Sequence, residues 1–228
     1  YTIDSLIVHN SEYLMPSSQF SQGHALVVGA GADLPMTVTD AKQVAAVLVD
    51  ERRCAYPPAQ VNLLTDAAAN REAIRLGLKR LADQGPDVTV VIYFSGHGIA
   101  TPMHHLMPYG YDLRALATTA ISGAEFSAAL QAIRARKLLV VLDCCHAGGQ
   151  AELQGVTKTP IPVEGLATLA SGSGRVILAS SRRDELSWAN TSSFFTMALL
   201  EGLAGYGAAE QDGYARVLDI ALWVGRRV

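Results

Sequence analysis

The sequence predicts an α/β protein with a mostly parallel sheet covered by helices on both faces. Two short apolar runs of mainly branched residues, 88–94 (VTVVIYF) and 138–142 (LLVVL), are typical of strands buried on both sides. Strand-like and helix-like stretches alternate along the whole chain, as they do in parallel α/β sheets. Each run ends abruptly in polar residues, at the sheet edge where such folds place their ligands.

The other elements follow from apolar periodicity, turn residues and capping signals. Asp40 with Gln43, and Ser122 with Glu125, have the spacing of residues that cap the start of a helix. The remaining predicted strands are residues 24–29, 61–64 and 175–180. The predicted helices are residues 40–51, 70–82, 122–136, 194–203 and 215–224, and the predicted long loops are 99–115 and 148–174.

Two glycines follow the first predicted strand and invite a comparison with dinucleotide-binding loops. Gly29 and Gly31 match the start of the G-x-G-x-x-G pattern, but Leu34 stands where the third glycine belongs. We therefore predict a tight turn after the strand rather than a nucleotide site.

Composition limits the class of protein. The chain has 228 residues, half of them apolar, which suits one domain; we assign residues 1–20 to an arm or linker remnant and 21–228 to the domain. The chain ends without an obvious final element, which leaves C-terminal truncation open. A net charge of −3 gives no case for nucleic acid, and no apolar run approaches the ~20 residues that span a bilayer. Three cysteines, two of them adjacent, fit a reducing cytoplasm better than a disulfide framework.

The polar ends of the two central strands carry a thiol and an imidazole. Residues 95–98 (SGHG) follow one strand and residues 143–149 (DCCHAGG) follow the other. A thiol becomes a strong nucleophile as the thiolate, and a neighbouring imidazole can take its proton and pass it to a leaving amine. His97 and Cys145 suit these roles, and the backbone N–H groups of Gly98 and Cys145 suit an oxyanion hole. The pattern predicts a cysteine protease.

Two other interpretations of the cysteines stay open. Cys144 and Cys145 could be core residues, since buried cysteine is common in strands. A metal site with His97 and His146 is less favoured, because adjacent cysteines lack the gap that lets both thiolates reach one zinc ion.

The motif around His97, residues 93–98 (YFSGHG), and the motif around Cys145 resemble those of caspase-like peptidases, especially metacaspases and their bacterial relatives (clan CD). Their order and their separation of about 50 residues also agree. The resemblance covers nearly the whole chain. It implies a caspase-hemoglobinase fold with a mostly parallel six-stranded sheet between helices. It also implies a His97–Cys145 dyad without a required third member, and no cofactor, although calcium activation stays open.

The resemblance also bears on the substrate. Metacaspases line the pocket for the residue before the scissile bond with acids, matched here by Asp40 and Asp143, with Ser95 beside them and Trp188 near a neighbouring subsite. Converging carboxylates attract cations, so we predict cleavage after Arg in preference to Lys. Each residue has a structural alternative: Asp40 as a helix cap, Asp143 as a loop cap, Ser95 as a turn residue and Trp188 as a packing residue.

Relatives also suggest how such an enzyme is controlled. Lys158 lies in the predicted exposed loop and is a candidate for self-cleavage. We expect a protein or peptide substrate and an activating partner or upstream domain, with programmed death or antiviral defence as the setting. The alternatives are a catalytically silent caspase-like adaptor and a legumain-like or separase-like peptidase of different specificity.

Overall fold

The computed structural model describes residues 19–100, 104–146, 174–180, 192–208 and 215–228, and it has the α/β architecture that the sequence predicts. Parallel strands form the body of one sheet, with β3 in its middle. In spatial order these strands are β2 (Val61–Thr65), β1 (Gly23–Gly29), β3 (Thr89–Ala100), β6 (Lys137–His146) and β7 (Arg175–Ala179). Every predicted strand is present, and β3 and β6 run further toward their carboxyl ends than expected.

Two short strands extend the sheet beside the far end of β3. β4 (His104–Leu106) pairs antiparallel with residues 98–100 of β3, and β5 (Ile121–Ser122) pairs antiparallel with β4. The described part of the sheet therefore has seven strands, not the six expected. Neither short strand was predicted from the residues: β4 lies within 99–115, where a loop was expected, and β5 lies just after it, at the expected start of a helix. β4 forms because β3 continues far enough to offer it an edge.

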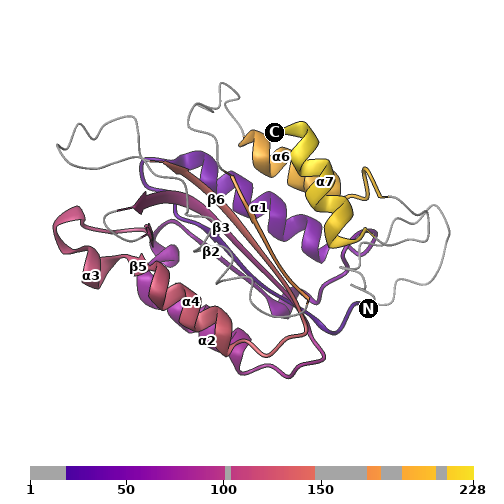
Figure 1. Cartoon of the computed structure of the whole chain (residues 1–228), viewed down its shortest axis with the longest axis horizontal. Helices are drawn as coiled ribbons and strands as arrows, with labels where there is room; N and C mark the ends of the chain where they lie inside the picture. Colours follow the sequence, from indigo (N-terminus) through magenta and orange to yellow (C-terminus); the bar gives the residue numbers. More distant parts are fainter. Residues whose placement is uncertain (1–18, 101–103, 147–173, 181–191, 209–214) are drawn as a thin grey trace.

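Helices cover both faces of the sheet (Figure 1). None of the described helices combines the length and apolarity needed to cross a lipid bilayer. One face carries α1 (Pro35–Val49), α6 (Phe194–Leu203) and α7 (Val217–Arg227), and the other carries α2 (Arg71–Ala82) and α4 (Gly123–Ala132). The shorter pieces are α3 (Leu116–Thr119) and the 3₁₀ turns Pro58–Gln60, Asp66–Ala69 and Leu113–Ala115.

Apolar side chains of the central strands alternate between the two helical layers. On β6, Leu139 and Val141 pack with α1 and α6, whereas Val140 and Leu142 pack with α2 and α4. Successive residues of a strand point to opposite faces, so the two cores are filled from the same strands. The same alternation applies to the polar ends of β3 and β6, so odd-numbered positions there belong to the α1 and α6 face and even-numbered positions of β6 to the α2 and α4 face.

Helix α1 begins earlier than the sequence suggested. The expected start at Asp40 is wrong, because the helix begins at Pro35, whose missing N–H is no loss in the first turn. Asp40 lies inside the helix and is fully buried, so it does not cap it. Helix α2 begins as predicted: the side chain of Asn70 accepts a hydrogen bond from the N–H of Ala73 at 3.0 Å.

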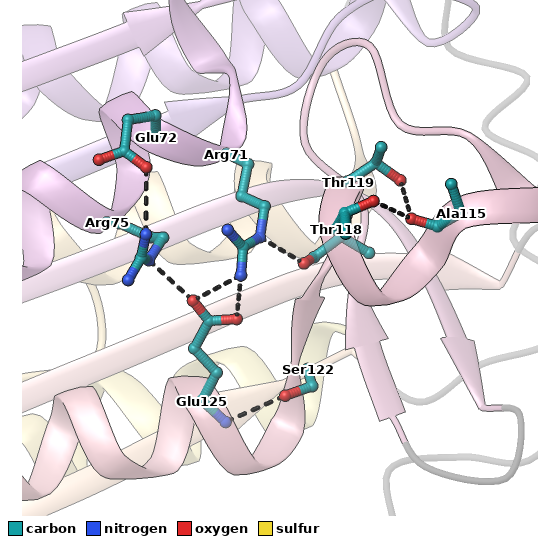
Figure 2. Close-up of polar contacts among 9 residues, drawn as sticks. Arg71, Glu72, Arg75, Ala115, Thr118, Thr119, Ser122 and Glu125 are labelled. Atoms are coloured by element: carbon teal, nitrogen blue, oxygen red, sulfur yellow. Dashed lines mark hydrogen bonds and ion pairs between the residues drawn. The ribbon is translucent and has the colours of Figure 1, made fainter.

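Helix α4 was expected to begin with a capping box between Ser122 and Glu125, and one of the two hydrogen bonds of that box is present. The Ser122 hydroxyl accepts the N–H of Glu125 at 3.1 Å, but the Glu125 carboxylate does not close a capping box. It instead binds Arg71 and Arg75 on α2 at 2.9 Å each (Figure 2). The helix ends at Ala132, earlier than expected. Glu125 therefore fastens the two helices of this layer to each other.

The turn after β1 forms as predicted from its glycines. A Cβ on Gly29 would come within 2.3 Å of the Thr37 carbonyl oxygen, so glycine lets α1 approach the strand closely. Gly31 has a φ of +66°. The two glycines thus serve the backbone of a strand–turn–helix connection.

Candidate active site

The candidate site lies at the carboxyl ends of β3 and β6, which run side by side and parallel. In their register Ser95 pairs with Asp143 and His97 pairs with Cys145. The pairing continues through Gly98 and His146, so the polar motifs are held inside the sheet rather than in loops beyond it. The backbone therefore places the predicted base and the predicted nucleophile at matching positions of adjacent strands.

The imidazole of His97 lies between an acid and an aromatic ring. Its Nε2 is 2.9 Å from an Oδ of Asp33, in the turn after β1. Its ring meets that of Tyr111 edge-on, with the centroids 6.2 Å apart. Burial and the charge of Asp33 raise the pKa of Tyr111. Nδ1 of His97 is buried and has no hydrogen-bond partner within the described part of the chain.

The two adjacent cysteines have different surroundings. Cys144 is 5% exposed and belongs to the apolar core beneath α2 and α4. A cysteine buried among apolar side chains behaves as a small apolar packing residue. The side chain of Cys145 lies outside the described residues, but its backbone position is fixed by pairing with His97. The expectation of a core role thus fits Cys144.

Two buried carboxylates meet beneath the N-terminus of α6. Asp40 and Asp143 are 0% and 2% exposed. The N–H of Ser193 lies 3.3 Å from both carboxylate oxygens of Asp40, and the Ser193 hydroxyl donates to Asp143. Burial is the main reason that the pKa of Asp40 rises to about 6, and the nearby Asp143 charge raises it further against the hydrogen bonds from Ser192 and Ser193. The structure therefore brings together two carboxylates that repel each other.

A chain of hydroxyl groups continues from this pair into the sheet. Thr196 donates to Asp143 at 2.9 Å, and the Tyr93 hydroxyl lies 2.6 Å from the Thr196 hydroxyl. With Thr196 donating to the acid, Tyr93 donates to Thr196. Burial, followed by the charges of Asp143 and Asp40, raises the pKa of Tyr93 well above its usual value. Tyr93 thus stays protonated and can remain the donor.

The structure tests the local alternatives for three predicted pocket residues. Asp40 is not a helix cap, as shown above. Asp143 and Ser95 both lie within strands, because β6 continues to His146 and β3 to Ala100, so the loop-cap and turn roles considered for them are wrong. Ser95 is 2% exposed and pairs in register with Asp143 and with Gly29. Whether these residues hold substrate stays a prediction.

Several expectations fall on other parts of the chain. Lys158 and Trp188 lie outside the described residues, so the self-cleavage and subsite roles stay predictions. Among the residues that are described, no group of three or more His, Cys, Asp or Glu gathers as ligands for a metal ion. The roles of Gly98 and Cys145 in an oxyanion hole also stay predictions.

Asp33, Tyr111, Ser193 and Thr196 were missed by the sequence analysis. Asp33 and His97 are separated by 64 positions, and Ser193 and Asp143 by 50. The local signal for Ser193 was available: its hydroxyl accepts the N–H of Thr196 at 2.9 Å and caps α6. No local signal singled out Asp33, which follows a turn that seemed to have only a backbone role.

Comparison with known proteins agrees with this arrangement. A family model described as the caspase domain matches residues 22–228. The fold is also similar to a solved structure described as that of pro-sf-caspase-1, with a TM-score of 0.50 and 17% identity, covering 94% of this chain and 80% of that chain. No curated protein is significantly similar in sequence. The chain belongs to the caspase-domain family of cysteine peptidases.

Proposed function

We propose that the chain is an endopeptidase in which His97 is the general base and Cys145 the nucleophile, with cleavage after Arg in preference to Lys. The observation that carries the proposal is the in-register pairing of His97 with Cys145 at the carboxyl edge of adjacent parallel strands. This edge is where open α/β sheets bind ligands. Family membership supports peptide hydrolysis by a cysteine.

Strand alternation supports Cys145 rather than Cys144 as the nucleophile. Tyr93, Leu139 and Val141 belong to the α1 and α6 face. Alternate residues share a face, so positions 97 and 145 continue that face, while Cys144 belongs to the opposite core. The cysteine that shares a face with His97 is therefore Cys145.

The reaction follows from these two groups. His97 takes the thiol proton of Cys145, and the thiolate sulfur attacks the scissile carbonyl carbon. The C–S bond forms, and the C–N bond breaks as the imidazolium gives its proton to the leaving amine. Water then adds to the thioester, which releases the carboxylic acid and restores the thiol.

The oxyanion that forms on the carbonyl needs donors near the sulfur, and we assign this role to the N–H groups of Gly98 and Cys145. Gly98 lies in register with Leu106 on one side and His146 on the other. A Cβ on Gly98 would come 3.2 Å from both the Cys144 Cβ and the His104 Cε1. A Cβ at this position would lie on the Cys144 face of the sheet, opposite His97, so the glycine relieves crowding on that face and leaves the backbone N–H as the group that Gly98 offers to the site.

The preference for a basic residue rests on Asp40. This carboxyl group is buried, has a pKa raised to about 6, and forms no ion pair with the lysines and arginines of the described residues. A guanidinium entering between Asp40 and Asp143 would offset their repulsion and could bind bidentately, which favours Arg over Lys.

Access to these acids also supports regulation. Ser193 and the first turn of α6 cover both carboxylates, which are closed to solvent. A substrate side chain reaches them only after this segment moves. We therefore propose that a partner, an upstream domain or processing opens the pocket, with a cytoplasmic and metacaspase-like setting for the enzyme.

Peptide kinetics test the proposal. A set of fluorogenic peptides would differ only in Arg, Lys, Asp or Asn before the scissile bond, and each would be assayed with and without calcium. We expect fastest turnover after Arg, loss of turnover in Cys145→Ala and His97→Ala, and retained turnover in Cys144→Ala. Faster cleavage after Asp or Asn would overturn the specificity. Absence of turnover on every peptide after proteolytic activation would favour the silent adaptor.

Self-processing has its own test. The wild-type chain and Cys145→Ala would be incubated with calcium, and the fragments would be identified by mass spectrometry. We expect a fragment that ends at Lys158 from the wild type alone, and Lys158→Ala should suppress it. An intact wild-type chain under conditions where it cuts peptides would contradict self-cleavage at this site.

A further inference from the structure

The carboxylate of Asp33 makes the two ring nitrogens of His97 unequal. Nε2 lies 2.9 Å from Oδ2 of Asp33, whereas Nδ1 is buried and has no hydrogen-bond partner in the described part of the chain. The His97 side chain is 13% exposed and the Asp33 side chain 65% exposed, so the acid approaches from the solvent side. In a neutral imidazole one nitrogen carries the proton and the other accepts one. A carboxylate at Nε2 favours the proton there.

The turn that carries Asp33 is held by its own hydrogen bonds. The N–H of Leu34 donates to the Gly31 carbonyl at 3.0 Å, and the N–H of Gly31 donates to the Thr37 hydroxyl at 2.9 Å. That hydroxyl donates in turn to the Leu34 carbonyl at 2.8 Å. Ala32 has a φ of +58°, a conformation that residues with a Cβ rarely adopt. Such a conformation persists where the surroundings fix it, so the turn presents Asp33 in one position.

We propose that Asp33 is a positioning residue for His97, which makes Nδ1 the nitrogen that takes the proton of the nucleophilic thiol. This inference rests on the proposed pairing of His97 with Cys145. The Nε2–H donates to the Asp33 carboxylate and fixes the ring, and the lone pair of Nδ1 accepts the thiol proton. The resulting imidazolium lies next to the Asp33 carboxylate, whose charge stabilises it while the thiolate attacks.

The alternative is that the contact between Asp33 and His97 only stabilises the fold. Within the described part of the chain, the ring contacts the Asp33 carboxylate and the Tyr111 ring, and the backbone of His97 is in register with that of Cys145. Tyr111 is neutral near pH 7, because burial and the Asp33 charge raise its pKa. An exposed ion pair that serves only the fold contributes little to stability and would leave the acid–base behaviour of the site unchanged. Asp33 is therefore tested through the pH dependence of His97, not through stability.

The first experiment measures the pH profile of kcat/KM on the arginyl peptide. We expect Asp33→Asn to reduce kcat/KM about 10- to 100-fold at pH 7.5 and to change the shape of the pH profile, because the ring of His97 loses the carboxylate that orients it. Asp33→Glu, which keeps the carboxylate, should restore part of kcat/KM and part of the wild-type pH profile. Asp83→Asn is the matched control, because Asp83 is similarly exposed, pairs with Lys79 and caps the C-terminal end of α2, away from His97. A profile for Asp33→Asn that matches the wild type within twofold at every pH would overturn the proposal.

The second experiment does not need peptidase activity. ¹⁵N-histidine NMR would follow the His97 ring in a Cys145→Ala background, with His97→Ala to assign its signals. We expect the neutral ring to carry its proton on Nε2, and Asp33→Asn to weaken this preference. A tautomer distribution that is the same in Asp33→Asn as in the parent protein would refute the role of Asp33. Because this result stands whether or not any peptide is cut, failure of the proposed function and failure of the Asp33 assignment are distinguishable.

Discussion

Two carboxylate clusters, one in each helical layer, differ in the groups that bind their carboxylates: arginine side chains in one, and a backbone N–H and a hydroxyl in the other. Between α2 and α4, Glu125 receives two hydrogen bonds from Arg71 and an ion pair from Arg75 (Figure 2). Beneath α6, Asp40 and Asp143 are held by the backbone N–H and the hydroxyl of Ser193. The first cluster contains its own cations. In the second cluster, no lysine or arginine of the described residues forms an ion pair with Asp40.

The difference shows which of the two clusters is suited to a ligand. The Glu125 carboxylate is neutralised by two arginines of the same protein, so it links α4 to α2 and does not need a cationic ligand. The pair beneath α6 is buried, and its mutual repulsion helps raise the pKa of Asp40 to about 6. Strongly perturbed carboxyls of this kind concentrate at functional sites, where they reduce stability. The comparison therefore predicts that charge removal lowers activity at one cluster and lowers stability at the other.

The largest expected effect is on turnover at the buried pair. Asp143→Asn keeps the shape and an accepting oxygen but removes the charge that a basic side chain would meet. We expect kcat/KM on the arginyl peptide to fall about 100-fold or more, with a much smaller change on peptides that have a neutral residue at that position. The measurement is kcat/KM for both peptides, with Glu125→Gln as the matched control at the other cluster. Equal losses on both peptides would contradict a substrate-binding role.

The next effect is a gain in stability on removing the Asp40 charge, whereas most substitutions lower stability. Burial and Asp143 raise the pKa of Asp40 from an ordinary value of 3.8 to about 6. The folded state therefore binds this proton more tightly than the unfolded state, and the free energy of unfolding falls as the pH rises from about 4 to about 6. The shift corresponds to at most about 3 kcal/mol. Above pH 6 this loss is complete.

Asp40→Asn should remove that loss. We expect the variant to unfold with a free energy about 1–3 kcal/mol higher than the wild type at pH 7, and no higher at pH 3.5, while it cleaves arginyl peptides less efficiently. Urea denaturation at a series of pH values measures the effect. A variant that is less stable than the wild type at pH 7 would show that Asp40 serves the fold rather than a ligand.

The sheet and most of its helices were predictable because their signals are local. The apolar runs at 88–94 and 138–142 became β3 and β6, and the pattern at 194–203 gave α6 with the same bounds. The start of α1 was missed, because Asp40 resembles a cap in sequence whereas Pro35 opens the helix. Propensity near a helix end depends on contacts that only the fold supplies, and here Thr37 binds the turn before the helix.

The residues of the candidate site that follow the two central strands were predictable, whereas those that reach the site from other elements were missed. His97 and Cys145 follow apolar runs whose parallel pairing sets their register. Asp33 reaches His97 from the end of another strand, and Ser193 reaches Asp40 from 153 positions away. These contacts depend on strand order and on how α6 packs against α1. Neither feature is encoded by periodicity within a short window.

The smallest expected effect concerns the complete cluster, where charge removal should alter stability alone. Glu125→Gln keeps the backbone N–H that Ser122 accepts and removes only the charge between Arg71 and Arg75. The Arg71 and Glu125 side chains are 25% and 28% exposed, so solvent screens part of the interaction and we expect a loss of about 1 kcal/mol.

Urea denaturation at low and high salt measures this loss, which should shrink in 1 M NaCl as the surface charges are screened. A double-mutant cycle with Arg71→Gln isolates the pair, and its coupling energy should account for most of the loss. Peptide cleavage should stay within twofold of the wild type in all three variants. A fall in kcat/KM that exceeds the change in stability would mean that the two helical layers communicate, and the division between a structural and a ligand-binding cluster would then have to be abandoned.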